Sequence, residues 1–382
     1  MKFRVDRDAF ADAVAWTARA LPARPAAPVL AGMRVEAAED GLRLSGFDYE
    51  VSTRARVDAD IEETGEVLVS GRLLAEIARS LPAEPVELHT DAARALLTCG
   101  SARFTLLTLP LEDYPVLPEM PGSAGSVPAD RFAAAVRQVA PAAGRDDTLP
   151  MLTGVHLAFR GDTLTLAATD RYRVAVRRTW WRPEDPALSA SALVPARTLH
   201  DFARSLPSGG NVGVALSTLP LGEAAKSSRG EGMIGFDTGS RRTTSRLIDS
   251  DFIDYEPRFP AEAAARAEVP VAAMAEAVRR VALVADRSTP LRLSFTEGEV
   301  VLEAGSGDDA QAAEALSVAY RGEPMRVAFA PGYFLDGLGG VGTETAWLDF
   351  TLPTKPVVVS EVPAEEGADP DFRYLVMPLR VS

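Results

Sequence analysis

The chain has 382 residues, of which 47% are hydrophobic and 25% charged, a composition typical of a globular protein and unlike that of a disordered one. At roughly 100–200 residues per domain, this length predicts two to four domains. Forty basic and 54 acidic side chains leave a formal charge of −14, which argues against a surface that is basic all round, as is usual for nucleic-acid binders.

The cellular compartment is suggested by what the sequence lacks. Its single cysteine, Cys99, excludes an intrachain disulfide and fits a reducing environment. The start, MKFRVDRDAF, lacks the apolar core of a signal peptide, and no run approaches the ~20 apolar residues of a membrane span. We therefore expect a soluble, cytoplasmic protein.

The first third of the chain contains three recognisable segments. VDRDAFADAVAWTARAL, from Val5, starts extended and continues with apolar residues at helical spacing, which predicts a helix. GLRLSGFDYEVSTRARV, from Gly41, alternates apolar and polar residues and predicts half-buried strands. LVSGRLLAEIARSLP, from Leu68, predicts a strand, a turn and a short amphipathic helix.

The middle third repeats these three patterns in the same order. They are VPADRFAAAVRQVAPAA from Val127, DTLTLAATDRYRVAVRR from Asp162 and LVPARTLHDFARSLP from Leu193. The last third repeats them again as VPVAAMAEAVRRVALVA from Val269, EVVLEAGSGDD from Glu299 and AFAPGYFLDGLGGV from Ala328.

Residues three and four apart in the repeated helices predict one buried stripe on each. The stripes are Phe132, Val136 and Val139 in the second copy, and Met274, Val278 and Val281 in the third.

The repeat unit has the size of a domain. The copies begin about 120 and about 140 residues apart, far above the ~20–50 residues of a solenoid unit. We expect three tandem homologous α+β domains, each with two helices and antiparallel sheets, at 1–122, 123–263 and 264–382. Pro-, Gly- and Ser-rich 117–128 and polar 261–270 fit the joints, and the longer second copy is expected to carry a surface loop around 217–235.

No catalytic or metal-binding constellation stands out. The histidines, His89, His156 and His200, are far apart, and none has a ligand-type partner at metal spacing, so structural or surface roles are expected. Cys99 lies in a strand-like pattern, which favours a buried apolar role over a nucleophile. We expect no enzyme activity, no cofactor and no metal; a hydrolase using carboxylates has no nucleophile or base to support it.

One motif matches a nucleotide-binding pattern by letter only. Gly337, Gly339 and Gly342 spell G-x-G-x-x-G, but the dinucleotide motif must follow a strand and open a helix. Here the order is reversed, because YFLDGL predicts a helix that ends in glycines and TAWLDFTL predicts a strand after them. Helix-stop glycines are therefore expected.

The predicted helices carry many arginines despite the acidic total. These are Arg7, Arg19, Arg72, Arg79, Arg131, Arg137, Arg197, Arg204, Arg279 and Arg280, partly offset by Asp12, Glu76, Asp201 and Glu276. Two interpretations stay open: ordinary solvated helix faces, or one surface, shared by the repeated helices, that faces a common polyanion.

Four further segments follow one another along the chain: ARPAAPVLAGM (23–33), RFTLLTLPLEDYP (103–115), ATDRYRVAV (168–176) and YLVMPLRVS (374–382). With these motifs in this order, the whole chain resembles the bacterial sliding clamp family, the β subunit of DNA polymerase III. DDTLPMLTG together with TDRYR is most similar to the actinobacterial branch.

The resemblance implies a head-to-tail homodimer ring of six similar domains that encircles duplex DNA without sequence preference. Edge strands of the first and third domains would pair, with Phe104 and Leu106 packing against Leu283 and Val284, although plain core roles remain an alternative. Arg24 matches a family residue that reaches DNA. The other DNA candidates rest on helix placement alone: Arg72, Arg79, Arg137, Arg197 and Arg204.

The resemblance also implies a hydrophobic cleft for short peptides of the DNA polymerase III α subunit, the clamp loader and other proteins with clamp-binding motifs. A Met-containing apolar groove suits several related peptides. By motif match and by position, its residues are Leu152, Thr169, Asp170, Arg171, Tyr172, Arg173, Val174, Ile253, Pro257, Arg258, Tyr333, Leu375, Val376, Met377, Pro378, Leu379 and Arg380.

Several residues near this cleft depart from the family pattern. Arg171 and Tyr172 stand where many members have Gly-His, Val174 where Leu is usual, and Ala330 where Asn is common. Ile253, Pro257 and Arg258 also replace other types. Two alternatives follow: a clamp paralogue whose altered cleft gives self-resistance to a clamp-binding cyclic peptide antibiotic, or a clamp-like decoy that binds partners without supporting replication.

Overall fold

The computed structural model describes residues 1–91, 93–217, 232–285, 290–305, 310–365 and 367–379. The chain forms two compact units, each treated by itself below. Unit 1 comprises 1–130, 182–185 and 204–247, and unit 2 comprises 131–181, 186–203 and 248–382. The expected loop at 217–235 falls largely outside the described residues.

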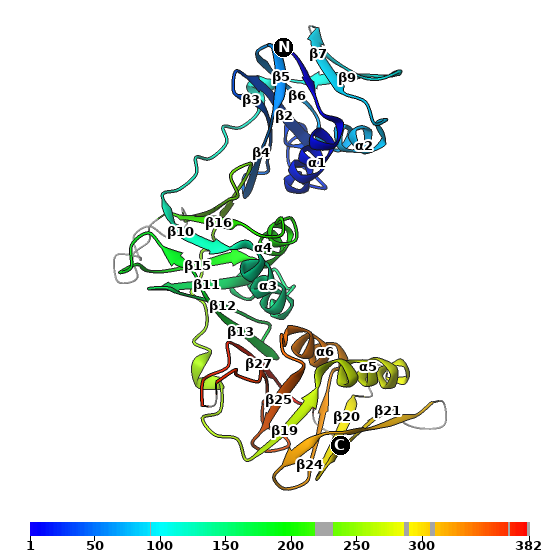
Figure 1. Ribbon diagram of the computed structural model, residues 1–382, viewed down its shortest axis with the longest axis vertical. Coiled ribbons are helices and arrows are strands. Elements are labelled where there is room, and N and C mark those ends of the chain that lie inside the picture. The colour runs from blue at the N-terminus through cyan, green and yellow to red at the C-terminus, as the bar shows by residue number, and fades with distance from the viewer. Residues whose placement is uncertain (92, 218–231, 286–289, 306–309, 366, 380–382) are drawn as a thin grey trace. The chain divides into compact units, whose positions relative to one another are not determined.

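Unit 1 is built on one antiparallel sheet with two helices, α1 (Arg7–Thr17) and α2 (Gly71–Ser80), on one face (Figure 1). Its fourteen described strands run in the order β14 (Arg182–Pro183), β10 (Ser123–Pro128), β16 (Asn211–Leu216), β17 (Met233–Asp237), β18 (Arg241–Arg246), β4 (Val51–Val57), β3 (Gly41–Phe47), β2 (Gly32–Ala38), β6 (Gly65–Ser70), β9 (Ala102–Leu109), β8 (Arg94–Cys99), β7 (Val86–Asp91), β1 (Lys2–Val5) and β5 (Ala59–Glu63).

The start of α1 is fixed locally. Asp6 Oδ1 accepts hydrogen bonds from the backbone N–H groups of Asp8 and Ala9, at 3.0 and 2.9 Å, which satisfies two helix-end donors. Phe10 and Val14, four residues apart, then point into the core and are fully buried.

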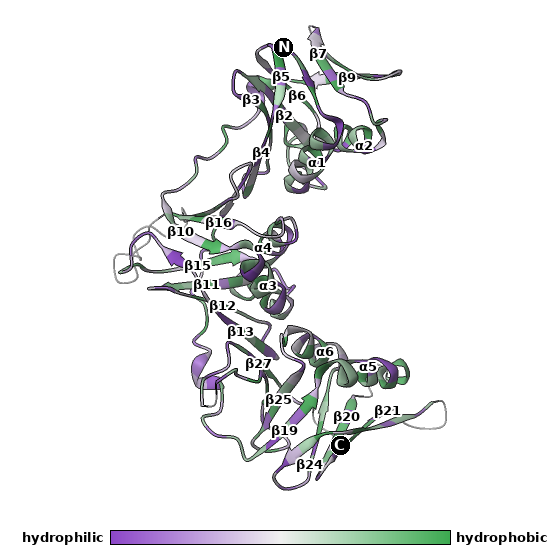
Figure 2. Cartoon of the chain, in the orientation of Figure 1, coloured by the Kyte–Doolittle hydropathy of each residue, from purple (hydrophilic) through white to green (hydrophobic). Residues whose placement is uncertain are grey.

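Unit 2 contains two antiparallel sheets. The nine-stranded sheet runs β15 (Ser189–Pro195), β11 (Gly154–Arg160), β12 (Thr163–Thr169), β13 (Arg173–Trp180), β27 (Phe372–Val376), β26 (Val357–Glu361), β25 (Thr345–Phe350), β19 (Ala265–Pro270) and β23 (Ala319–Arg321). The four-stranded sheet runs β22 (Ala312–Ser317), β21 (Glu299–Ala304), β20 (Leu291–Thr296) and β24 (Met325–Phe329). Buried and exposed residues alternate along β19, and hydrophobic and hydrophilic residues are interspersed over the strands of this unit (Figure 2).

Four helices of unit 2 lie on the same side of its strands (Figure 1). They are α3 (Ala129–Val139), α4 (Ala196–Ala203), α5 (Val271–Val281) and α6 (Pro331–Gly340). Phe132, Val136 and Val139 are all buried, which confirms the predicted stripe of α3. The stripe of α5 is confirmed too, by Met274, Val278 and Val281.

The internal repeats are confirmed as elements. The first helix of each copy follows a strand, as β1–α1, β10–α3 and β19–α5, and the second does so as β6–α2, β15–α4 and β24–α6. Strands also pair across the expected joints, β4 with β18 and β13 with β27. Because of this pairing, the two compact units do not have the same boundaries as the three sequence repeats.

The glycines of the G-x-G-x-x-G match lie at the end of α6, before β25, so the reversed order is confirmed. Packing, as well as helix termination, explains why glycine stands at position 337. A Cβ atom added to Gly337 would lie 2.6 Å from the ring of Tyr374, so only glycine lets β27 approach the helix this closely.

Cys99 is buried, as expected, and its thiol donates to the carbonyl oxygens of Pro82 and Glu84. Among the described residues, no group of three or more His, Cys, Asp or Glu side chains could hold a metal ion. In the same part of the chain, no helix has the length and apolarity needed to cross a membrane.

Candidate functional site

The turn that joins β12 to β13 is the centre of the candidate cleft in unit 2. Asp170 Oδ1 accepts from the backbone N–H groups of Tyr172 (3.1 Å) and Arg173 (3.2 Å), and the Thr169 hydroxyl donates to the Arg173 carbonyl oxygen (2.6 Å). Arg171 occupies the left-handed region with φ 81°. The turn is thus held from within, and it presents Arg171 and Tyr172 to solvent.

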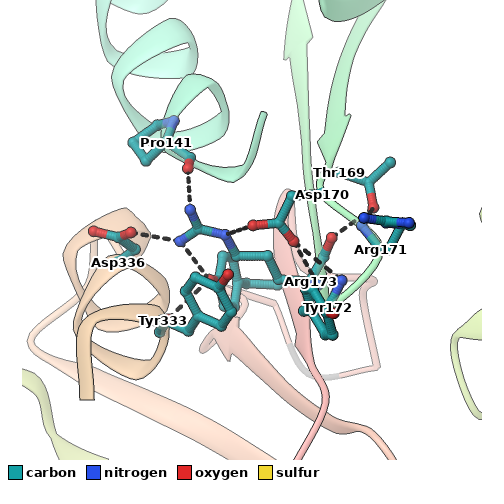
Figure 3. Close-up of polar contacts among 9 residues, drawn as sticks. Pro141, Thr169, Asp170, Arg171, Tyr172, Arg173, Tyr333 and Asp336 are labelled. Atoms are coloured by element: carbon teal, nitrogen blue, oxygen red, sulfur yellow. Dashed lines mark hydrogen bonds and ion pairs between the residues drawn. The ribbon is translucent and has the colours of Figure 1, made fainter. Parts of the chain in front are cut away.

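Arg173 points the other way and is only 8% exposed. Its guanidinium donates to Asp170 Oδ2 at 2.9 Å, to Asp336 Oδ2 at 2.5 Å and to the Pro141 carbonyl oxygen at 2.5 Å, and it lies 4.3 Å from the centre of the Tyr333 ring (Figure 3). A buried charge is tolerated when it is paired and hydrogen-bonded in this way. One side chain therefore ties together the end of the α3 segment, α6 and the β12–β13 turn.

Tyr374 of β27 completes this cluster. Its hydroxyl accepts from Arg173 at 3.3 Å and donates to the Tyr333 carbonyl oxygen at 2.8 Å. Burial raises the pKa of Tyr374 well above its usual value, and Arg173 only partly opposes this, so Tyr374 stays protonated. Burial acts to lower the pKa of Arg173, but Tyr374, Asp336 and Asp170 together raise it above its usual value.

An apolar cluster lies beside Arg173. Val174, Val176 and Leu375 are buried, and the partly buried rings of Phe252 and Phe259 pack over them. The packing comes from strand alternation in β13 and β27, which places these side chains on one face. The segment after β18 therefore covers part of this apolar surface with its own aromatic residues.

His156 supports that segment from β11. Its ring stacks on Phe252 at a centroid distance of 5.0 Å and an angle of 6°. Desolvation, helped by Arg160, lowers the pKa of His156 to about 4, so the imidazole is neutral at pH 7. The expected structural role of His156 fits this placement.

The exposed rim of the cluster is formed by two tyrosines and the C-terminal segment. Tyr172 and Tyr333 stack at 6.3 Å, and Tyr172 is 54% exposed. Met377 (39% exposed) and Leu379 (45% exposed) are anchored by their backbone, because Met377 N–H donates to the Tyr172 carbonyl oxygen at 2.8 Å. Large apolar side chains are thus accessible next to a fixed polar cluster, an arrangement that suits a peptide ligand.

The structure brings together most, but not all, of the predicted cleft residues. Around the turn and the C-terminal segment it gathers Thr169, Asp170, Arg171, Tyr172, Arg173, Val174, Tyr333, Leu375, Val376, Met377, Pro378 and Leu379. Leu152 is buried at the end of a short 3-10 turn, and Ile253 is half-buried next to Phe252. Pro257 and Arg258 are exposed in the turn Glu256–Arg258, and Arg380 lies outside the described residues.

Three members of the Arg173 cluster were missed by the sequence analysis. Asp336 looks like any surface carboxylate of a helix, and Pro141 takes part through its carbonyl oxygen, which no side-chain pattern reports. Tyr374 did carry a signal, because it alternates with Phe372 in a strand and a buried tyrosine needs a hydrogen-bond partner.

The six DNA candidates are all exposed. Arg24 lies in the loop after α1, Arg72 and Arg79 on α2, Arg137 on α3, Arg197 on α4 and Arg204 just after α4. Other helix arginines are engaged locally: Arg7 donates to the Leu81 carbonyl oxygen at 2.8 Å, and Arg280 pairs with Glu314 at 2.6 Å. Fewer helix arginines are therefore free to contact DNA than the number of arginines in the predicted helices suggested.

The predicted interface residues divide between the core and the surface of the single chain. Leu106 is 3% exposed and belongs to the core cluster of unit 1, against which the half-buried Phe104 also packs. Because side chains alternate along β9, its neighbour Leu107 faces solvent instead and is 72% exposed. Leu283 is 84% exposed after α5, and Val284 is half-buried.

Comparison with known proteins places this arrangement in a family. Residues 1–118 match the N-terminal domain of the DNA polymerase III beta subunit, residues 126–254 its central domain and residues 258–380 its C-terminal domain. The chain belongs to this family, the bacterial beta sliding clamps. The resemblance found from the four motifs is confirmed.

Relatives over the full length include actinobacterial clamps. The chain is 55% identical to a beta sliding clamp of Streptomyces coelicolor, covering all of both chains. It is 44% identical to the beta sliding clamp homolog GriR of Streptomyces muensis, covering all of this chain and 99% of GriR.

Solved structures share the fold. A sliding clamp of Bacillus subtilis matches with a TM-score of 0.89 at 23% identity, covering all of both chains. A Pseudomonas aeruginosa clamp bound to griselimycin matches with a TM-score of 0.88 at 28% identity over the same coverage. The fold prediction of three tandem clamp domains is confirmed.

Proposed function

We propose that this protein is the processivity factor of a replicative DNA polymerase: a ring of two chains that encircles duplex DNA. The observation that carries the proposal is the match of all three family domains along one chain, in order. Its action is topological rather than catalytic, and it takes place in the cytoplasm without a cofactor. The proposed domain boundaries remain 1–122, 123–263 and 264–382.

Ring closure is proposed to use edges of strands β9 and β22. From Ala102 to Leu107, β9 is paired along one side by β8, whereas its pairs with β6 begin only at Thr108. β22 is paired only with β21. A head-to-tail contact between such edges of two different domains closes into a ring. Phe104 and Leu106, which share one face of β9, are proposed to pack against Leu283 and Val284 next to this pairing. The burial of Leu106 also fits the alternative of a plain core role.

The ring is proposed to bind DNA weakly. Each neutralised phosphate releases counterions and adds affinity, so a basic ring would grip and stop. The exposed helix arginines give a modest positive surface, while the chain as a whole carries −14. The ring is retained because it is closed, and it slides because each contact is replaceable.

The cleft is proposed to bind short apolar peptides of the polymerase α subunit, the clamp loader and repair proteins. Tyr172, Met377 and Leu379 supply accessible apolar surface, and the Arg173 cluster keeps the turn and the C-terminal segment in place. A single adaptable groove can serve these partners in turn.

Primer extension by a cognate polymerase and clamp loader tests the main proposal. On circular primed DNA the protein should lengthen the products, and linearising the template should remove most of that gain because a ring slides off free ends. Blocking the ends should restore it. An equal gain on open linear DNA would contradict a topological mechanism.

A second candidate function concerns a peptide antibiotic. It is favoured by Tyr172, which stacks on Tyr333 at the rim of the cleft, and by Arg171 in the same turn. A paralogue with this rim would exclude a cyclic peptide yet admit linear partner peptides. Titration of this protein and a housekeeping clamp with the same cyclic peptide decides the matter, since equal affinities exclude a resistance role.

A further inference from the structure

A hollow rich in arginine lies in unit 1, and none of its lining residues belongs to a helix or to the candidate cleft. It has a volume of about 370 Å³ and is lined by Asp40, Arg43, Arg54, Arg56, Gly239, Ser240 and Arg242. Four arginines and one aspartate give the lining a formal charge of +3, although the whole chain carries −14. Its volume is within the ~300–1,000 Å³ of small-molecule sites.

Strand register explains why these arginines converge. Arg43 of β3 is paired with Arg56 of β4, and Arg54 of β4 is paired with Arg242 of β18. Directly paired residues project to the same face of a sheet. Leu44 and Ala55, which alternate with them, are buried on the other face, where α1 packs. The hollow is therefore on the face opposite to the helix α1.

Three of the four arginines are held in position by hydrogen bonds, two to carboxylates and one to a backbone carbonyl oxygen. Arg43 donates to both Asp40 oxygens at 2.7 Å, and Arg242 donates through Nε to Asp237 at 2.8 Å. Arg56 donates to the Asp40 carbonyl oxygen at 2.7 Å. These bonds fix the side chains and leave other N–H donors of Arg56 and Arg242 available.

Arg54 is different, because no hydrogen bond or ion pair joins its guanidinium to any described residue. Desolvation, together with Arg34, Arg43 and Arg242, lowers the pKa of Arg54, and Glu36 opposes this only in part. Like charges gathered around one unpaired cation are unfavourable without an anion. Arg54 is exposed, so an anion from solvent can reach it and would relieve this repulsion.

We propose that this hollow binds a chain of linked phosphates, such as pyrophosphate, tripolyphosphate or the phosphate tail of a nucleoside triphosphate. Several guanidinium groups on neighbouring strands match the spaced oxygens of linked phosphates, and arginine forks bind phosphate in bidentate fashion. None of the lining residues is aromatic or large and apolar, so a base finds no stacking surface. Recognition is confined to the phosphates, and it does not depend on the sliding-clamp proposal.

Isothermal titration of the full-length protein tests the proposal, with sodium pyrophosphate, tripolyphosphate, ATP and adenosine as separate titrants without Mg²⁺. The three phosphates should bind and adenosine should not. Arg54→Gln should weaken pyrophosphate binding by about tenfold or more, since it removes a charge-assisted donor pair. Arg94→Gln, an exposed arginine on β8 of the same sheet, should leave binding unchanged and serves as the matched control.

The outcomes separate the sources and the alternatives. Equal affinity for ATP and tripolyphosphate is the expected result, because the lining offers recognition to the phosphates alone. Tighter binding of ATP than of tripolyphosphate would show that the nucleoside is recognised too, and would overturn the restriction to phosphates. Absence of pyrophosphate binding by the wild-type protein overturns the proposal, as does an unchanged affinity in Arg54→Gln. Displacement of pyrophosphate by a short DNA duplex would instead assign the patch to nucleic acid and also overturn it. Thermal unfolding of both variants checks that they fold.

Discussion

The stack of His156 on Phe252 makes the stability of unit 2 depend on pH in a defined window. The pKa of His156 is lowered to about 4 in the folded chain, whereas an unfolded histidine titrates near 6.5. Between these values the unfolded chain binds a proton that the folded chain does not. The contribution of His156 is thus fully present above about pH 6.5 and is lost as the pH falls toward 4.

The size of the effect follows from the two pKa values. The difference of about 2.5 units corresponds to a total loss of about 3.4 kcal/mol below pH 4, and to about 1.4 kcal/mol between pH 8 and pH 5.5. The source is the desolvation of the buried imidazole, to which the positive charge of Arg160 adds a smaller contribution. His156→Phe keeps a stacking ring and removes the titration.

Urea unfolding at pH 8 and pH 5.5 measures this loss. The wild-type protein should lose about 1.4 kcal/mol more than His156→Phe over that range, while His89→Gln, at an exposed position on β7, should follow the wild type. Equal pH dependence of the wild-type protein and His156→Phe would refute the burial argument. At pH 5.5 most carboxylates are still ionised, so they contribute little to the difference.

Three further outcomes are expected. Arg173→Lys should destabilise unit 2 by about 3 kcal/mol in urea unfolding, since it leaves Asp336 and the Pro141 carbonyl without their donors. A double-mutant cycle with Asp336→Asn should show strong coupling between Arg173 and Asp336, and independent effects of the two substitutions would contradict that ion pair. Arg171→Gly should raise stability by about 0.5–1 kcal/mol, because φ 81° costs a side chain energy that glycine does not pay, and a loss would disprove strain there. Leu283→Asp should raise the dimer dissociation constant, measured by light scattering, at least about 100-fold. Leu352→Ser, at another exposed leucine, is the control, and an unchanged dissociation constant for Leu283→Asp would exclude Leu283 from the interface.

Some features of the fold could be predicted from the spacing of residues in the sequence, and others could not. Helix stripes such as Phe132 and Val136 depend on spacing alone, so periodicity found them and their burial confirms them. For Leu106 of β9, the sequence leaves an interface role and a plain core role both open. It lies in the core cluster of unit 1 while Leu107 faces solvent, because successive side chains of a strand point to opposite faces. Both Leu106 and Leu107 are leucines, so no alternation of residue type marked the difference.

The Arg173 cluster shows that hydrogen-bond partners far apart in the sequence could not be predicted. Arg173 and Tyr333 were named from motifs, but their partners Asp336 and Tyr374 come from α6 and β27, and Pro141 contributes a backbone oxygen. A partner that is far away in sequence and ordinary in type leaves no local pattern. The pairing of β13 with β27 brings Arg173 close to Tyr374. The packing of α6 and of the turn Ala140–Ala142 brings Asp336 and Pro141 to the same guanidinium.

Net charge is a poor guide to what an arginine does, because surroundings decide its role. Arg173 is buried and fully paired, so its charge is neutralised where it stands and stabilises the fold. Arg197 is 95% exposed and only 3.9 Å from Asp201 on its own helix, so it can exchange that weak partner for a phosphate at little cost. Arg54 is exposed, has no carboxylate partner among the described residues, and is surrounded by Arg34, Arg43 and Arg242. Of the three, Arg54 therefore gains most from an external anion, and a total of −14 says nothing about it.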